Sequence, residues 1–246
     1  SSPGPLPILL TRPEAAAKRL AAQVRARLGD GWPVLMSPLT GVRFLAPVLD
    51  LAGVDGVIFT SENGVEGFAR LSGWRGALAW CVGARTAEAA RAAGFEAVAG
   101  PGDAAGLLPM LAAEDGPRHP FWARGARVSV DLAPELAPVL ARHGVALRSA
   151  VVYDRDRLAL SAEVRAHLAS GAGAIWPVYS VGSAEDGLSA LAGLPLSNLR
   201  AVAISAPVAD LLAPLVRSVH VAERPDAAAM IEALATFARR DARRDG

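Results

Sequence analysis

Short apolar runs that end abruptly in polar residues recur along the chain, and each is followed by apolar residues at helical spacing. In the stretch 55–68, the run Val57-Ile58-Phe59 ends at Thr60-Ser61. A continuous apolar run is typical of a parallel strand covered on both faces, and the polar elbow after it predicts the start of a helix. The free N–H groups of a first helical turn favour anions, so this elbow is a candidate binding site.

The helix after this elbow is expected to begin near Asn63. Asn63 and, three residues later, Glu66 have the spacing of a capping pair, which satisfies free N–H groups at the start of a helix. The remaining N–H groups of that turn would point toward the carboxyl end of the preceding strand.

A second elbow of the same kind follows the strand predicted over residues 77–82. Gly83 permits close approach of the backbone, and a helix is expected over residues 87–93. Thr86 has two interpretations: it caps this helix, or it offers its hydroxyl to a ligand.

Four segments of the first half return in the same order in the second half, which indicates an internal duplication. The pairs are 10–13 with 122–125, 57–66 with 176–185, 80–83 with 202–205, and 101–104 with 224–227. Their offset drifts only from about 112 to about 123 residues, as expected when loop lengths change between two copies of one unit. The alternative interpretation is that any two α/β halves look alike.

The glycine-rich stretch 100–106 resembles a dinucleotide-binding loop in composition. Its counterpart, 223–227, keeps Asp226 and has none of the glycines. Both copies therefore need only an aspartate that caps a helix, Asp103 in the first and Asp226 in the second. We interpret both as structural turns, and we expect no cofactor.

Strands that alternate with helices throughout predict parallel sheets flanked by helices, the doubly wound α/β architecture. Ligands of such sheets bind at the carboxyl ends of the strands. The elbows of two such domains are therefore expected to face one cleft; they lie at 60–64, 83–87, 180–184 and 205–209.

Composition narrows the classes of function. The net charge of +1, from 25 basic and 24 acidic residues, argues against a nucleic-acid partner, whereas the excess of arginine over lysine suits a polyanionic small molecule. The four histidines lie far apart without metal-ligand spacing, so we expect no metal. The single cysteine, Cys81, lies in an apolar strand and is interpreted as a buried structural thiol.

No apolar run approaches the ~20 residues that a membrane-spanning helix needs. The first residues, Ser-Ser-Pro-Gly-Pro, lack the charged and apolar regions of a signal peptide. We therefore expect a cytoplasmic protein, and a monomer that binds neither membrane nor nucleic acid. The charged tail 238–246 is expected to be solvated.

Four motifs together resemble the bacterial uroporphyrinogen-III synthase family. They are LLTRP at 9–13, FTSENGV at 59–65, VGARTAEA at 82–89 and VVYDR at 151–155. Their order and spacing together carry the resemblance, which covers nearly the whole chain. The C-terminal half departs from the family pattern. Where many members carry a Gly-Pro-Thr-Thr-like turn, this sequence has Ser205-Ala206-Pro207-Val208.

The resemblance implies two flavodoxin-like domains joined by a pair of crossing strands. One domain would contain both ends of the chain. Domain one would comprise 1–38 and 158–246, domain two 43–150, and the crossing strands 39–42 and 151–157.

The resemblance also implies an activity in tetrapyrrole (haem and chlorophyll-type) biosynthesis. The family is a group of cofactor-independent hydro-lyases that close hydroxymethylbilane, a linear tetrapyrrole, with loss of water and inversion of ring D, giving uroporphyrinogen III. A substrate with eight carboxylates suits helix N-termini, hydroxyls and arginines. On the family's motif, Tyr153 is the residue expected to assist departure of the substrate's hydroxyl.

The remaining candidates are residues of the elbows and arginines at strand ends, which we expect to bind substrate: Arg12, Thr60, Ser61, Asn63, Gly64, Val65, Gly83, Arg85, Thr86, Arg124, Ser180, Ser183 and Ser205. Two other classes of function stay open. The altered turn at 205–208 would suit a catalytically silent relative. The second class is a two-domain sensor that binds an anionic ligand, although the sequence has no recognisable module that would pass on the signal.

Overall fold

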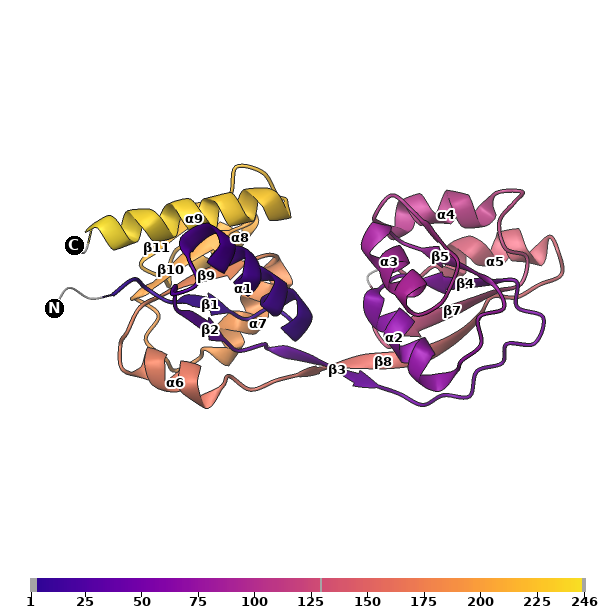
Figure 1. The fold of residues 1–246 in the computed structure, drawn as a ribbon, viewed down its shortest axis with the longest axis horizontal. Helices are drawn as coiled ribbons and strands as arrows, with labels where there is room; N and C mark the ends of the chain where they lie inside the picture. Colours follow the sequence, from indigo (N-terminus) through magenta and orange to yellow (C-terminus); the bar gives the residue numbers. More distant parts are fainter. Residues whose placement is uncertain (1–3, 129, 245–246) are drawn as a thin grey trace. The chain divides into compact units, whose positions relative to one another are not determined.

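The computed structural model describes residues 4–128 and 130–244, which form two compact units (Figure 1). Unit 1 contains both ends of the chain, up to Gly41 and from Arg157 onward, and unit 2 is Val42–Asp156. Residues 1–3, 129 and 245–246, which the sequence assigns to the two predicted domains, lie outside the described residues.

Unit 1 is a parallel sheet with helices on both faces. Its strand order is β11-β10-β9-β1-β2. The strands are β1 (Ile8–Leu10), β2 (Val34–Met36), β9 (Ala174–Val178), β10 (Leu199–Ala203) and β11 (Ser218–Val221). The helices are α1 (Glu14–Leu28), α6 (Ala162–Ala169), α7 (Val181–Ala190), α8 (Ala206–Leu212) and α9 (Ala227–Arg244).

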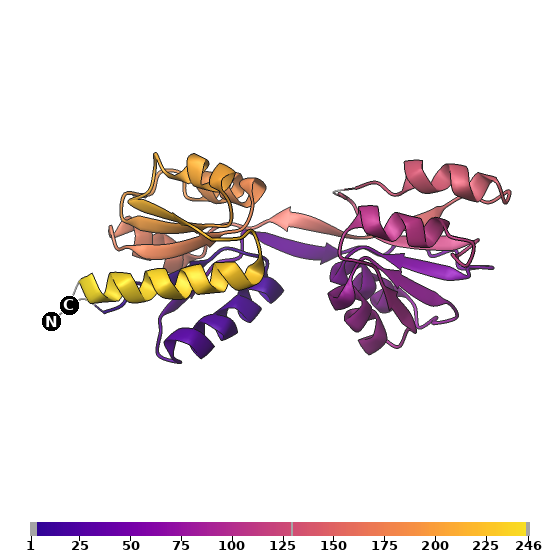
Figure 2. The ribbon, with the colours of Figure 1, turned by 90° about the horizontal axis from the view of Figure 1, so that it is seen from above.

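Alternate residues of β1 supply the two halves of the unit 1 core, as the period of a strand requires. Ile8 and Leu10 pack in the cluster that includes residues of α1 and α9. Leu9 points to the other face, into the cluster that contains Trp176 and residues of α6, α7 and α8. Figure 2 shows α1 (indigo) and α9 (yellow) on one side of the sheet and the orange helices on the other.

Unit 2 is built in the same way. Its sheet has the order β3-β8-β7-β4-β5-β6. The strands are β3 (Thr40–Phe44), β4 (Gly56–Phe59), β5 (Leu78–Cys81), β6 (Ala97–Ala99), β7 (Pro120–Gly125) and β8 (Arg148–Arg157). The helices are α2 (Glu62–Leu71), α3 (Ala84–Ala92), α4 (Ala104–Ala112) and α5 (Ala133–Ala141).

An aromatic cluster fills one face of the unit 2 sheet, beneath α2 and α3. The ring of Phe68 meets those of Phe59, Phe95 and Phe121 edge to face, with centroids 5.9, 5.6 and 6.2 Å apart. Such pairs add about 0.5–1.5 kcal/mol each beyond the area they bury. Ile58 and Trp122 point to the opposite face, which α4 and α5 cover.

The two sheets share one arrangement of strands. The order β8-β7-β4-β5-β6 of unit 2 matches β2-β1-β9-β10-β11 of unit 1 in space. Unit 1 follows the flavodoxin-like order along the chain, whereas unit 2 reaches the same arrangement with β4 as its first strand. Of the segments paired in the sequence, 10–13 begins at the last residue of β1, and 122–125 is the second part of the equivalent strand β7. In each unit the chains leaving the two central strands go to opposite faces, β1 to α1 and β9 to α7 in unit 1. This pair is the point at which the direction of strand connection reverses, here called the switch point.

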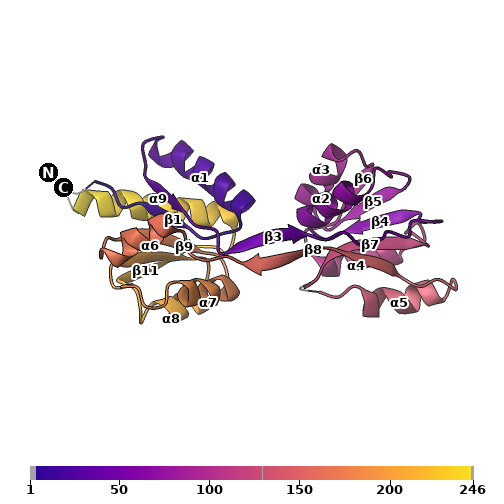
Figure 3. The same ribbon diagram turned by 90° about the horizontal axis from the view of Figure 1, so that it is seen from below.

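Strands β3 and β8 run in opposite directions (Figure 3). Leu45 N–H donates to the Val152 carbonyl at 3.0 Å, and Leu158 N–H donates to the Leu39 carbonyl at 2.9 Å. The charged stretch 154–157, which lies in the crossing strand 151–157 implied by the family resemblance, therefore continues β8, and its backbone pairs with β3.

Alternating charge supports this pairing of strands. Asp154 and Asp156 lie two residues apart on β8 and so share a face. Arg43 on β3 contacts both carboxylates, at 3.6 and 3.1 Å. Each of these exposed pairs is worth about 0–1 kcal/mol, so they specify the register more than they stabilise the fold.

Two predicted aspartate caps are confirmed. Asp103 accepts a hydrogen bond from Gly106 N–H at 2.7 Å, and Asp226 accepts one from Ala229 N–H at 2.7 Å. The bond from Ala229 is the main cause that lowers the pKa of Asp226. The glycine-rich stretch is thus a turn that ends in a helix cap.

The expectation of a solvated tail is wrong for part of it. Helix α9 continues to Arg244, and Asp241 is buried, with its Oδ1 atom 2.7 Å from Arg200 Nε. The local sequence does not predict this burial, because the partner of Asp241 is Arg200 on β10, far away in the sequence. Residues 245 and 246 of the predicted tail lie outside the described residues.

Gly187 of α7 provides a test of the unit 1 packing. A Cβ at Gly187 would lie 2.3 Å from Cζ2 of the buried Trp176, so Gly187→Ala is expected to lower the free energy of unfolding of unit 1 by roughly 1–3 kcal/mol. Gly182, on the same helix, has nothing within 4 Å of its Cβ position. Gly182→Ala should therefore leave stability unchanged or raise it by up to about 1 kcal/mol in urea unfolding. Equal losses in the two variants would contradict the close helix-to-sheet contact.

Candidate functional site

The elbow after β4 is shaped by Ser61. Ser61 is the N-cap of α2, and its Oγ accepts a hydrogen bond from Gly64 N–H at 3.1 Å. The predicted cap at Asn63 is wrong, because β4 ends at Phe59 and the helix already begins at Glu62. Glu66, the other member of the predicted pair, instead forms an ion pair with Arg70 at 2.7 Å.

Tyr153 reaches this elbow from β8. Its hydroxyl lies 2.9 Å from Ser61 Oγ, at hydrogen-bond distance, while its side chain belongs to the hydrophobic cluster that contains the four phenylalanines, with 6% of the residue exposed. Ser61 and Tyr153 were both predicted site residues. The structure brings them into contact across 92 positions of sequence.

Two glycines make room for this contact. A Cβ at Gly125 would lie 2.7 Å from Tyr153 Cζ, and a Cβ at Gly64 would lie 2.8 Å from the Ala123 carbonyl oxygen. The register of β7 and β8 shifts between Arg124 and Gly125, which pairs Gly125 with Tyr153. Gly64 therefore matters because α2 approaches the backbone of β7 closely.

At the unit 2 switch point, a tryptophan of one strand bonds a threonine at the end of the next. Trp122 Nε1 donates to Thr60 Oγ1 at 3.3 Å. The guanidinium carbon of Arg124 lies 5.3 Å from the Trp122 ring centroid, and Arg124 Nε is buried without a hydrogen-bond partner among the described atoms.

The unit 1 switch point has the same kinds of residue. Trp176 Nε1 donates to Thr11 Oγ1 at 3.0 Å. The Arg12 guanidinium stacks on the Tyr179 ring, 3.9 Å from its centroid. Burial raises the pKa of Tyr179, and the nearby charge of Arg12 partly opposes this shift.

The elbow after β9 repeats the cap seen after β4. Ser180 is the N-cap of α7, and its Oγ accepts from Ser183 N–H at 3.0 Å. The Ser180 hydroxyl also donates to Ser183 Oγ at 2.8 Å, and both serines are exposed. Ser205 occupies the N-cap position of α8 but makes no side-chain capping bond.

The elbow after β5 differs from the prediction. Gly83 is the N-cap of α3, which begins at Ala84. Thr86 is therefore inside the helix and buried, so it is not the cap. A Cβ at Gly83 would lie 3.0 Å from Gly102 Cα, which explains the glycine by a close backbone approach. Arg85 is exposed.

Val65, a predicted substrate-binding residue, offers no side chain to a ligand. It is 2% exposed within the unit 2 core, and its N–H donates to the Ser61 carbonyl inside α2. Asn63 remains half-buried in the first turn of α2.

Sequence reasoning missed four residues of these strand ends: Trp122, Trp176, Gly125 and Tyr179. A buried tryptophan needs an acceptor for its Nε1–H group. A tryptophan inside an apolar strand, together with a threonine at the end of another strand, could have indicated the hydrogen bonds of Trp122 and Trp176. Nothing in the sequence pattern points to Gly125.

Cys81 is a buried thiol, as predicted, and burial raises its pKa to about 12. Such a thiol is protonated at neutral pH and is a poor nucleophile. In the described part of the chain, no three histidine, cysteine, aspartate or glutamate residues gather as metal ligands would. None of the helices described combines the length and the apolar character needed to cross a bilayer.

A family model described as uroporphyrinogen-III synthase HemD matches residues 18–232, which is most of the chain. The chain belongs to the uroporphyrinogen-III synthase family. The resemblance carried by the four sequence motifs is thereby confirmed. No curated protein sequence matches the chain significantly.

Solved structures from this family are similar to the chain. The crystal structure of the uroporphyrinogen-III synthetase from Helicobacter pylori 26695 matches with a TM-score of 0.55 and 18% identity, over 85% of this chain and 94% of that one. A mutant uroporphyrinogen III synthase from the bacterium Thermus thermophilus matches with a TM-score of 0.48 and 19% identity, over 98% of this chain and 100% of that one. The predicted doubly wound α/β fold of two domains is confirmed.

The environment of Tyr179 predicts a pH effect. The protein has two tyrosines, so Tyr153→Phe leaves Tyr179 as the only phenol that titrates. Its absorbance midpoint in the native protein is expected above the ordinary value of about 10, because burial disfavours the phenolate. The stabilisation linked to this raised pKa is fully present below about pH 10 and is lost as pH rises through the folded-state pKa. The same variant in urea serves as the control and should titrate near 10; coincident midpoints would contradict the buried placement.

Proposed function

We propose that this protein converts hydroxymethylbilane into uroporphyrinogen III, with loss of water and inversion of ring D. The match of the family model over residues 18–232 carries this proposal. The site supports it, because arginines, helix N-termini and hydroxyls gather where the strands of each unit end, and such groups suit a polycarboxylate substrate.

Several modest contacts together would supply the affinity. Arg12 and Arg124 offer guanidinium groups at the two switch points, and the first turns of α2 and α7 lie on the same strand ends. A helix terminus contributes ~0.3–1 kcal/mol and a charge-assisted hydrogen bond ~1.5–3 kcal/mol. A handful of such contacts reaches the ~8 kcal/mol of micromolar binding without a metal or cofactor.

Tyr153 is the group that we assign to departure of the hydroxyl. A phenol O–H group can donate its proton to a departing oxygen as a general acid. As the C–O bond of the hydroxymethyl group breaks, the electron pair leaves with oxygen and the phenol proton completes a water molecule. The electron-rich pyrrole supplies the push. The proton lost when the ring closes restores the phenol.

Ser61 would orient that proton. Its Oγ already accepts the Gly64 N–H, so its own hydrogen is available for the Tyr153 oxygen 2.9 Å away. When Ser61 donates in this way, the phenol hydrogen is left to point at the substrate. Because Ser61 also begins α2, the cap and the phenol are held in one geometry.

We further propose that the protein acts as a cytoplasmic monomer with no nucleic-acid or membrane partner. The binding role of the remaining elbow residues belongs to this proposal. Those whose side chains or backbone lie at the strand ends are Thr60, Asn63, Gly64, Gly83, Arg85, Ser180, Ser183 and Ser205.

The product isomer tests the function. The purified protein is incubated with freshly made hydroxymethylbilane, and the uroporphyrinogen isomers are separated. We expect isomer III, whereas the uncatalysed reaction gives the symmetrical isomer I. Formation of isomer I alone would contradict the proposed activity, and the protein would then be a catalytically silent relative or an anion sensor. The unusual Ser205 turn, whose serine makes no capping bond, is the feature that favours the silent relative.

Tyr153→Phe tests the assigned acid. The variant keeps the ring in its aromatic cluster and removes only the hydroxyl, so turnover is expected to fall by roughly 10²–10⁴-fold with little change in KM. Tyr179→Phe is the comparison variant, because it removes the other phenol hydroxyl, which interacts with Arg12 and not with Ser61, so that any effect is expected on KM. We expect turnover of the comparison variant within a few-fold of the parent. A similarly small effect of Tyr153→Phe would reduce Tyr153 to a packing role.

A further inference from the structure

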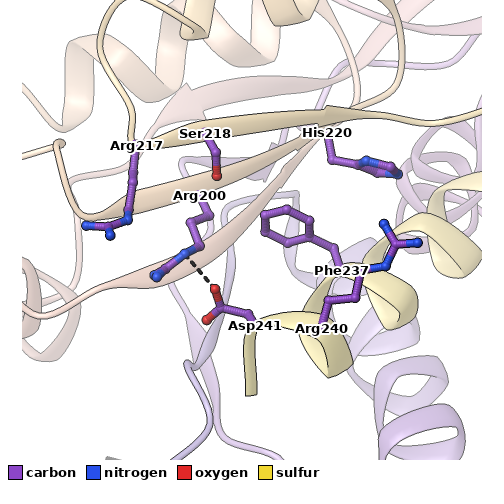
Figure 4. Close-up of a pocket in the computed structure, with 7 residues that line it drawn as sticks. All are labelled: Arg200, Arg217, Ser218, His220, Phe237, Arg240 and Asp241. Atoms are coloured by element: carbon purple, nitrogen blue, oxygen red, sulfur yellow. Dashed lines mark ion pairs between the residues drawn. The ribbon is translucent and has the colours of Figure 1, made fainter. Parts of the chain in front are cut away.

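Unit 1 has a cavity of about 410 Å³ at the end of its sheet opposite the elbows. It lies at the amino ends of β10 and β11, against the last turns of α9 (Figure 4). No residue of the proposed substrate site lines it. The volume is in the range of cavities that hold small molecules.

The strand register explains why polar groups gather there. Arg200 of β10 is the register partner of Ser218 of β11, so their side chains share one face of the sheet. His220, two residues on, points to the same face, and its ring stacks on Phe237 of α9 with centroids 5.9 Å apart. Arg217 immediately precedes β11, about 10 Å along the strand from His220.

The floor of the cavity is an ion pair. Arg200 Nε lies 2.7 Å from Asp241 Oδ1, and the two side chains are only 15% and 11% exposed. Each charge offsets the other. The excess charge of the cavity therefore comes from its rim.

Arg217 and Arg240 are exposed on that rim, and neither forms an ion pair with any carboxylate of residues 4–128 or 130–244. The last turn of α9 offers about half a negative charge to nearby cations. This partial negative charge is smaller than the two positive charges of Arg217 and Arg240. The rim therefore keeps a net positive charge.

The two rim arginines lie at different ends of the cavity. In Figure 4, Arg217 is beside Arg200 and Ser218, whereas Arg240 is beside His220, and the Phe237 ring lies between these groups. The arrangement is a basic group at each end and an apolar, flat surface in the middle. A ligand that complements it has two acid groups separated by an apolar spacer.

We propose that this cavity binds an organic diacid, with one carboxylate at Arg217 and Ser218, the other at Arg240, and the spacer against Phe237. Arginine suits both ends because its planar fork of N–H donors matches a carboxylate. This site is separate from the strand ends assigned to hydroxymethylbilane, and its test does not depend on that activity.

Calorimetry of the full chain with terephthalate, a flat para-diacid, tests the proposal at constant ionic strength. Saturable one-to-one binding is expected, at least tenfold tighter than that of benzoate, which has one acid group. Terephthalate that binds no better than benzoate, or shows no saturation, would overturn the proposal.

Arg217→Ala and Arg240→Ala should each weaken terephthalate binding about tenfold, toward the affinity of benzoate. Both side chains are exposed, so neither change disturbs the fold, whereas removal of Arg200 would leave Asp241 buried without its partner. Arg25→Ala and Arg165→Ala are matched controls, because both arginines are exposed on unit 1 outside the cavity. Equal weakening in the controls would indicate general charge attraction and contradict the site.

Hydrogen exchange locates the ligand in the unaltered protein. Terephthalate should slow exchange in peptides that cover residues 217–220 and 237–241, and should leave the elbow at 180–184 unchanged. Protection confined to the elbows would overturn the assignment to this cavity.

Discussion

Two adjacent parallel strands whose chains leave toward opposite faces define the site of each unit. In open α/β sheets, ligands bind outside the carboxyl ends of the strands at such a point. In unit 1 this pair is β1 and β9, and in unit 2 it is β7 and β4. The arginines, hydroxyls and helix N-termini of the candidate site lie on these loops. Within each unit, the remaining strands and helices hold its two loops in place by burying the faces of its sheet.

Each switch point has a hydrogen bond from a tryptophan to a threonine, but the two residue types are on opposite strands in the two units. In unit 2 the tryptophan is on β7 and the threonine follows β4, whereas in unit 1 the threonine follows β1 and the tryptophan is on β9. Since β1 corresponds to β7 and β9 to β4 in strand order, donor and acceptor have changed strands. A hydrogen bond between the ends of the central strands is therefore common to both units, although the residues at each position differ. Comparison by sequence position alone does not reveal it.

Local pattern was enough to predict most elements, because apolar runs such as 57–59 and helix caps such as Asp103 act over a few residues. It failed where neighbouring residues have similar capping preferences. Ser61 and Asn63 are both good caps, and the choice depends on where β4 ends. The contact between Ser61 and Tyr153 and the burial of Asp241 depend on residues distant in sequence, which no local pattern encodes. The elements that carry the candidate site were thus predictable, whereas the contacts between its residues were not.

The insertion of unit 2 into unit 1 has a consequence for the order of folding. Strand β1 is synthesised first, but Thr11 lies 165 positions before its hydrogen-bond partner Trp176. Closing so long a loop directly costs more entropy than closing a short one. Unit 2 is a continuous segment whose first and last residues, Val42 and Asp156, belong to the neighbouring strands β3 and β8, so its folding brings the two flanking segments of unit 1 together. The long loop of unit 1 then becomes a short one, and unit 2 acts as an internal clamp that prepares the two ends of the chain to meet.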